Sequence, residues 1–144
     1  MSTLLFESEE QRFARCYEHA CGYHRRARLL VNQTSSASLV FNVAAIAVEC
    51  YLIALCALHG EMPMNHNYRS LLRSVEEKTQ VDASLREDIL SLDGIFGICS
   101  IDDYHHGAPN DDDKVRILAI CDAIDALIHA DQARLAGTPV EKTL

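Results

Sequence analysis

The feature that most constrains this chain is an apolar run of twenty residues near its middle. Between Leu39 and Leu58, only Asn42 and Glu49 interrupt a series of apolar and small side chains. As a helix, this segment would be about 30 Å long, which is also the hydrophobic thickness of a membrane. A membrane span would place Glu49 near the bilayer centre, at a cost of roughly 2.5–3.5 kcal/mol, and the segment lacks flanking basic residues and an aromatic belt. The sequence therefore favours the central helix of a bundle, covered by other helices on most sides.

Local signals on both sides of this segment predict the helices that cover it. Ser8 and Gln11 form a capping box, and apolar residues then recur every three to four positions up to Val31. Gly60 supplies the usual C-terminal stop for the central helix. Asp82 caps a fourth helix, and three aspartates beginning at Asp111 favour the start of a fifth because they complement the helix dipole. The predicted helices span roughly 8–31, 39–59, 67–78, 82–99 and 111–134.

This pattern predicts an all-α fold. No segment shows the alternation of a strand, and four long helices with one short helix describe an antiparallel four-helix bundle of five helices. The 144 residues are enough for a single domain with its own core. We expect one domain over 1–144 with a core over about 8–133. Residues 135–144 contain Gly137 and Pro139 and are expected to form a frayed tail.

Composition limits the classes of function. The net charge of −8 argues against non-specific DNA binding, which needs basic residues to displace counterions from phosphate. The six cysteines lie in apolar helical stretches without a CxxC pair, which is typical of buried thiols in a reducing compartment. The acidic N-terminus carries no signal-peptide pattern, so we expect a cytoplasmic location and no membrane partner. Phosphate-binding loops and zinc-peptidase motifs are absent from the sequence, so we expect no cofactor and no metal.

Glu49 and His66 are the first two candidate site residues. A carboxylate in the middle of a buried helix must be paired, hydrogen-bonded or protonated. Asn42 lies seven residues before Glu49 on the same helix face, so the two are expected to share a polar seam. His66 begins the short third helix after a proline-containing turn. A structural role is the leading interpretation for both residues, and ligand binding or dimer registration is the alternative.

A second candidate site lies before the last helix. This loop holds the densest cluster of titratable groups, and histidine can act near neutral pH as an acid, a base or a metal ligand. Adjacent loop residues rarely ligate one metal together, so we predict no metal site here. On the last helix, Asp122, Asp125 and His129 share a face, which we interpret as a solvated outer surface. The loop candidates are Asp103, Tyr104, His105 and His106.

Several short motifs resemble, in order and spacing, the HEPN family, the nucleotide-binding domains of higher eukaryotes and prokaryotes. These motifs are the run 47–55, the pair His59-Gly60 and the segment 66–72; the loop 103–106 falls where the family's functional loop precedes its last helix. The resemblance covers most of 11–133. It implies a helical bundle that commonly dimerises and occurs in RNases, toxins, antitoxins and proteins paired with nucleotidyltransferases.

The sequence also departs from the HEPN pattern. Ile53 replaces the family's lysine, and His105 and His106 lack the arginine, separated from the histidine by four to six intervening residues, that ribonuclease members carry. The resemblance therefore implies a non-catalytic, homodimeric binding or regulatory module, related to nucleotides or RNA. One alternative is a divergent ribonuclease or toxin in which Tyr104 and the two histidines replace the usual pair. Another is a partner subunit that positions substrate for a nucleotidyltransferase.

Overall fold

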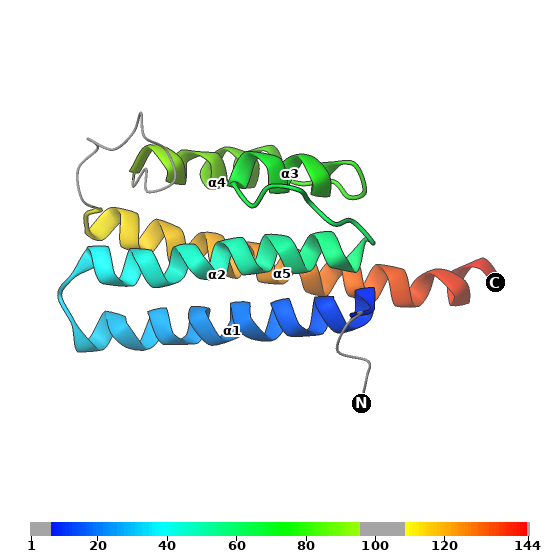
Figure 1. The fold of residues 1–144 in the computed structure, drawn as a ribbon, viewed down its shortest axis with the longest axis horizontal. Helices are drawn as coiled ribbons and strands as arrows, with labels where there is room; N and C mark the ends of the chain where they lie inside the picture. Colours follow the sequence, from blue (N-terminus) through cyan, green and yellow to red (C-terminus); the bar gives the residue numbers. More distant parts are fainter. Residues whose placement is uncertain (1–6, 96–108, 144) are drawn as a thin grey trace.

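A computed structural model describes residues 7–95 and 109–143, which form five helices and contain no strand. The all-α prediction is confirmed. Helices α1, α2 and α5 lie side by side, and the shorter pair α3 and α4 packs on the opposite side of α2 from α1 (Figure 1). The bounds are α1 Glu9–Gln33, α2 Ala37–Leu58, α3 Tyr68–Glu76, α4 Ala83–Ile95 and α5 Asp111–Thr143.

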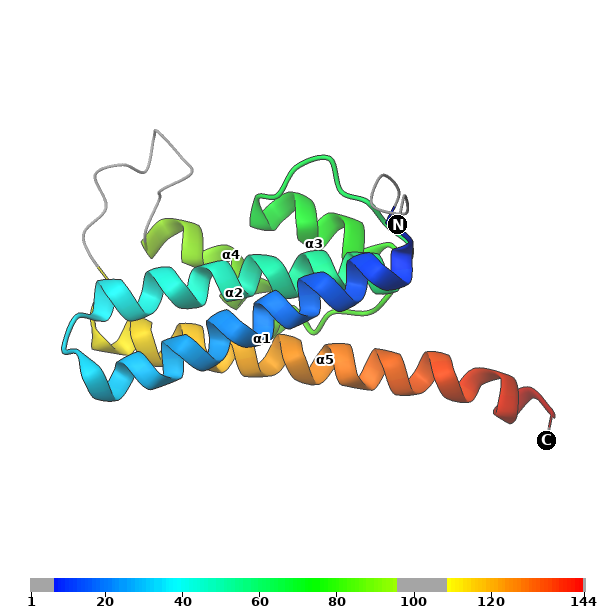
Figure 2. The same cartoon turned by 60° about the horizontal axis from the view of Figure 1, so that its bottom comes forward.

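Helix α1 begins at the predicted capping box. The Ser8 Oγ accepts the Gln11 N–H at 3.0 Å, and the Gln11 side chain accepts the Ser8 N–H at 2.9 Å. Small residues line the contact between α1 and α2, since Ala20 of α1 and Ala44 and Ala47 of α2 are all fully buried. Small side chains let two helix backbones approach closely, and α2 therefore packs along the length of α1 (Figure 2).

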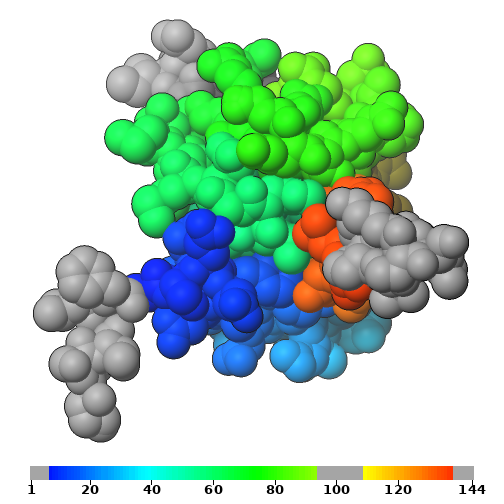
Figure 3. Space-filling model, turned by 90° about the vertical axis from the view of Figure 1, so that its right-hand side faces the viewer, coloured from blue at the N-terminus to red at the C-terminus, as the bar shows by residue number. Residues whose placement is uncertain are grey.

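Helix α2 lies in the middle of the molecule. Its start is capped by Ser36, and Gly60 follows its end with a φ of +76°, which confirms the predicted glycine stop. α1 covers one side, α3 and α4 cover another, and α5 packs behind it (Figures 1 and 3). By length and composition α2 could cross a membrane, the one such helix in the described part of the chain. However, 56% of its apolar window is buried within the protein.

Helices α3 and α4 cover α2 with a small apolar face. Asn67 caps α3, and Leu71, Leu72 and Val75 are buried beneath it. Ile89 and Leu92 of α4 are buried as predicted, whereas the last part of that stripe, Phe96 and Cys99, lies outside the described residues.

Helix α5 is longer than predicted. Its apolar face, which includes Ile117, Cys121 and Ile128, is buried as expected. The backbone then stays helical to Thr143, through the segment 135–143 that was expected to fray, and its end projects beyond the other helices (Figure 2). Proline has a φ of about −65°, which suits a helix, but inside a helix it removes one hydrogen bond and its ring clashes with the carbonyl four residues before it. The backbone nevertheless continues as a helix past Pro139.

Candidate functional site

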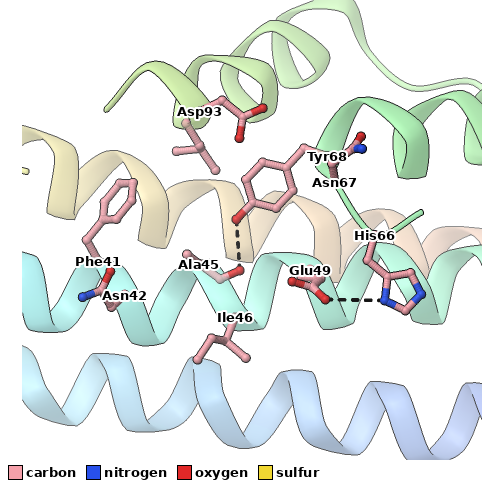
Figure 4. A pocket seen from close by; sticks show the side chains of 10 residues that line it. Phe41, Asn42, Ala45, Ile46, Glu49, His66, Asn67, Tyr68 and Asp93 are labelled. Atoms are coloured by element: carbon pink, nitrogen blue, oxygen red, sulfur yellow. Dashed lines mark hydrogen bonds and ion pairs between the residues drawn. The ribbon is translucent and has the colours of Figure 1, made fainter. Parts of the chain in front are cut away.

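A cavity of about 270 Å³ lies between α2 and the α3–α4 pair (Figure 4). Its walls are mainly apolar, and a few polar side chains reach it from α2, from the segment before α3 and from α4. A small pocket with apolar walls and a few converging polar groups is the usual form of a small-molecule site. The described lining residues are Phe41, Asn42, Ala45, Ile46, Glu49, His66, Asn67, Tyr68, Leu92 and Asp93.

Glu49 and His66 meet at this cavity. The His66 Nδ1 lies 3.7 Å from the Glu49 Oε2, close enough for an ion pair when the imidazole is protonated. The Glu49 side chain is 43% exposed and that of His66 is 55% exposed. The prediction that Glu49 lies in a buried environment is therefore wrong, because the side of α2 that carries it is left partly open between α1 and α3. Ion pairs this exposed contribute little to stability, about 0–1 kcal/mol.

His66 also differs from its predicted place. It lies in the segment before α3, and the helix cap is Asn67, whose side-chain oxygen accepts the Ser70 N–H at 2.8 Å. The imidazole is exposed and free of the capping role, so its contact with Glu49 is its main described interaction.

Asn42 confirms the predicted polar seam along α2. It lines the same cavity as Glu49, and its side-chain Oδ1 is buried without a hydrogen-bond partner in the described part of the chain. Tyr68 closes the wall between them, donating its hydroxyl to the Ala45 carbonyl oxygen at 3.1 Å. A buried carbonyl oxygen without a donor is uncommon in proteins, and it favours a ligand or water that can donate to it.

The predicted loop site cannot be placed. Asp103, Tyr104, His105 and His106 all lie outside the described residues.

A polar cluster that lies between α1 and α5 was not predicted from the sequence. The Tyr17 hydroxyl donates to the Asp125 Oδ1 at 2.7 Å and lies 2.8 Å from the His129 Nε2. Burial, with a second contribution from Asp125, raises the pKa of Tyr17 well above its usual range, so the phenol stays protonated. Asp122 and His129 are exposed, as expected for a solvated face, but Asp125 and His129 also contact Tyr17 of α1.

His24 and Tyr51 continue this cluster into the core. The buried His24 ring contacts the Tyr51 hydroxyl through Nδ1 at 2.7 Å and Asp122 through Nε2 at 3.2 Å. Asp122 also pairs with Arg28. Burial lowers the pKa of His24, with Asp122 opposing that effect. In the neutral ring, Nδ1 can accept from the Tyr51 hydroxyl, whereas the buried Nε2 lies near Asp122 without a hydrogen bond among the described residues.

A third polar group joins the end of α2 to α5. Asp131 is fully buried and contacts the His59 Nε2 at 2.7 Å and an Arg134 guanidinium nitrogen at 2.8 Å. The His59 side chain is only 7% exposed, whereas that of Arg134 is 54% exposed. These contacts join the C-terminal end of α2 to α5 and indicate a structural role.

The described residues contain no group of three or more histidine, cysteine or acidic side chains placed to hold a metal ion. Comparison with family models, with curated proteins and with solved structures gives no match. The resemblance to the HEPN family therefore stays a prediction from the sequence.

Proposed function

We propose that the chain is a non-catalytic binding module that acts as a homodimer through the uncovered side of α2. The observation that carries this proposal is a stripe of apolar side chains on that side. Leu39 and Ile46 are each 44% exposed, and the other members are half-buried. We call this set the outer stripe; it consists of Leu39, Val43, Ile46, Cys50 and Ile53.

The outer stripe has the spacing of a helix–helix seam. Its members are separated by four, three, four and three residues, which is the heptad repeat with which one helix packs against another. α1, α3 and α5 pack against the other sides of α2, and α4 packs against α3 and α5. A continuous apolar stripe that the described helices leave partly exposed favours a protein partner.

The order of side chains favours a second copy of the same chain. Around Ile46, large apolar residues lie seven positions away in both directions, at Leu39 and Ile53, and smaller ones lie between. In an antiparallel pair with a two-fold axis at Ile46, Leu39 of one copy would face Ile53 of the other. The order of side chains in the outer stripe is nearly the same in both directions along the helix. The stripe is therefore self-complementary, as the interface of a two-fold dimer must be.

The charges around four of the five described histidines support a non-catalytic role. His24, His59, His66 and His129 each contact a carboxylate. Metal-independent RNA cleavage needs a base together with a cation that stabilises the charge on the phosphate, and carboxylates beside the base repel that phosphate. We expect no cleavage when the purified protein is incubated with mixed RNA, with or without divalent metal. Cleavage that disappears in a His105→Ala/His106→Ala double variant would favour the ribonuclease alternative.

The dimer is tested by sedimentation of a matched pair of variants. Leu39→Lys introduces a charge into the outer stripe, whereas Leu29→Lys makes the same change on α1, away from the stripe and at 56% exposure. At micromolar concentrations we expect twice the 16.0 kDa of one chain for the wild type and for Leu29→Lys, and the mass of one chain for Leu39→Lys. A monomeric wild type contradicts the proposal, as does a Leu39→Lys variant that remains dimeric.

A further inference from the structure

We propose that the cavity between α2 and the α3–α4 pair binds a small organic cation, an ammonium group carried on an apolar body. This inference goes beyond the proposed dimer, and Ile46 belongs both to the cavity wall and to the outer stripe. It rests on the walls of the cavity, on the charges of its lining residues and on the buried oxygen of Asn42.

The walls of the cavity suit a ligand with an apolar body and a positive charge that would lie near an aromatic ring of the protein. Phe41 and Tyr68 contribute aromatic rings, and Ala45, Ile46 and Leu92 contribute aliphatic surface. The volume of about 270 Å³ is near the lower limit of small-molecule sites, about 300 Å³. A cation within about 6 Å of an aromatic ring face is attracted by the ring quadrupole. The cavity therefore suits a ligand with one ring or a short aliphatic chain.

The charges of the lining residues determine which sign of charge is favoured in a ligand. Glu49 on α2 and Asp93 on α4 contribute carboxylates from opposite walls (Figure 4), and His66, which is a cation only when protonated, is the one basic side chain among the described lining residues. A phosphate or carboxylate ligand would be repelled here. An ammonium group would be attracted, and it carries only hydrogen-bond donors.

Asn42 supplies the directional contact. Its buried Oδ1 accepts no hydrogen bond from the described residues and lies in the same seam as Glu49. An ammonium group has three N–H donors, and because Asn42 and Glu49 are about 10.5 Å apart along the helix axis, it could donate to the Asn42 oxygen or to the Glu49 carboxylate. Hydrogen bonds to charged groups are stronger than those between neutral groups. Donation to either acceptor therefore favours an amine over an alcohol of the same shape.

The test is a titration followed by the amide NMR signals of the residues that line the cavity. Three probes of similar shape separate charge from size: 2-phenylethylamine, 2-phenylethanol and 3-phenylpropionate. We expect saturable shifts with the amine, at least about tenfold weaker binding of the alcohol, and no binding of the anion, where tenfold corresponds to about 1.4 kcal/mol. Absence of saturation by the amine at millimolar concentration, or equal binding of amine and alcohol, overturns the proposal.

Two variants locate the binding. Glu49→Gln keeps the shape of the side chain and removes its charge; because Glu49 is partly exposed, we expect amine binding to weaken about fivefold rather than to vanish. Glu87→Gln, an exposed position on α4 outside the cavity, is the matched control and should leave binding unchanged. Ala45→Leu fills the cavity and should abolish binding while the helical circular dichroism signal is retained. Amine binding that is unaffected by Glu49→Gln, or that persists in Ala45→Leu, contradicts the proposed site.

The same titration is repeated with Leu39→Lys, since Leu39 does not line the cavity. We expect saturable amine binding by this monomeric variant, because all the described lining residues belong to one chain, although Ile46 is also part of the outer stripe. Loss of the dimer with amine binding retained, and loss of amine binding with the dimer retained, are therefore different results.

Discussion

Asp131→Ala removes the carboxylate that joins the end of α2 to α5. The change breaks the contacts of 2.7 Å with His59 and 2.8 Å with Arg134. Hydrogen bonds to charged groups contribute about 1.5–3 kcal/mol, and the exposed Arg134 adds about 0–1 kcal/mol. His59 is left buried without its acceptor, so we expect a total loss of about 2–4 kcal/mol. For a chain of this size that corresponds to a fall in Tm of roughly 5–15 °C.

The assay is urea unfolding followed by circular dichroism, with two comparisons. Arg134→Ala removes only the exposed partner and should cost no more than about 1 kcal/mol. Asp88→Ala, at an exposed position on α4, is the control and should lie within about 0.5 kcal/mol of the wild type. If Asp131→Ala were as stable as Asp88→Ala, Asp131 would not be the buried link between α2 and α5, and the reasoning would be refuted.

Three further predictions follow from burial and charge. Glu49→Leu, Glu49→Ala and Glu49→Lys should each change the free energy of unfolding by no more than about 1 kcal/mol, because the carboxylate is exposed and weakly paired; a loss of several kcal/mol in thermal melts of Glu49→Ala would contradict its exposure. Burial lowers the pKa of His24, so the unfolded chain binds that proton more tightly and stability falls as the pH drops below about 6.5; urea unfolding of His24→Gln should show a smaller fall, and an unchanged fall would refute this. Burial raises the pKa of Cys121 to about 12, so mass spectrometry should find this thiol unmodified after iodoacetamide treatment of the native protein near pH 8 and modified after unfolding; rapid native modification would place it at the surface.

Local sequence signals predicted the helix boundaries well. The Ser8 capping box, the Gly60 stop and the start of α3 each depend on residues within one helical turn, so nearby sequence is enough to identify them. The end of α5 was missed because glycine and proline usually mark the end of a helix. Glycine at 137 and proline at 139 did not end the helix.

The surroundings of the side chains were harder to predict. The apolar run in α2 indicates a central helix. However, an almost uniformly apolar helix does not show which of its sides lacks a neighbouring helix. For this reason Glu49 was predicted to lie in the core. Asn42 and Glu49 lie on the same face of α2 as predicted, because their seven-residue spacing is a local property of one helix; the cavity that both line was not predicted. Tyr17 and Asp125 are 108 residues apart, and no local pattern predicts that they meet.

The proposal that two copies meet through α2 is tested most directly by NMR on a mixed dimer of isotope-labelled and unlabelled chains. Isotope-filtered nuclear Overhauser spectra report only contacts between methyl groups of different chains. An antiparallel pair centred on Ile46 predicts contacts from Leu39 of one copy to Ile53 of the other, together with contacts between the two Ile46 side chains. Contacts between the two Leu39 side chains, or no intermolecular contact from the outer stripe, would contradict the account.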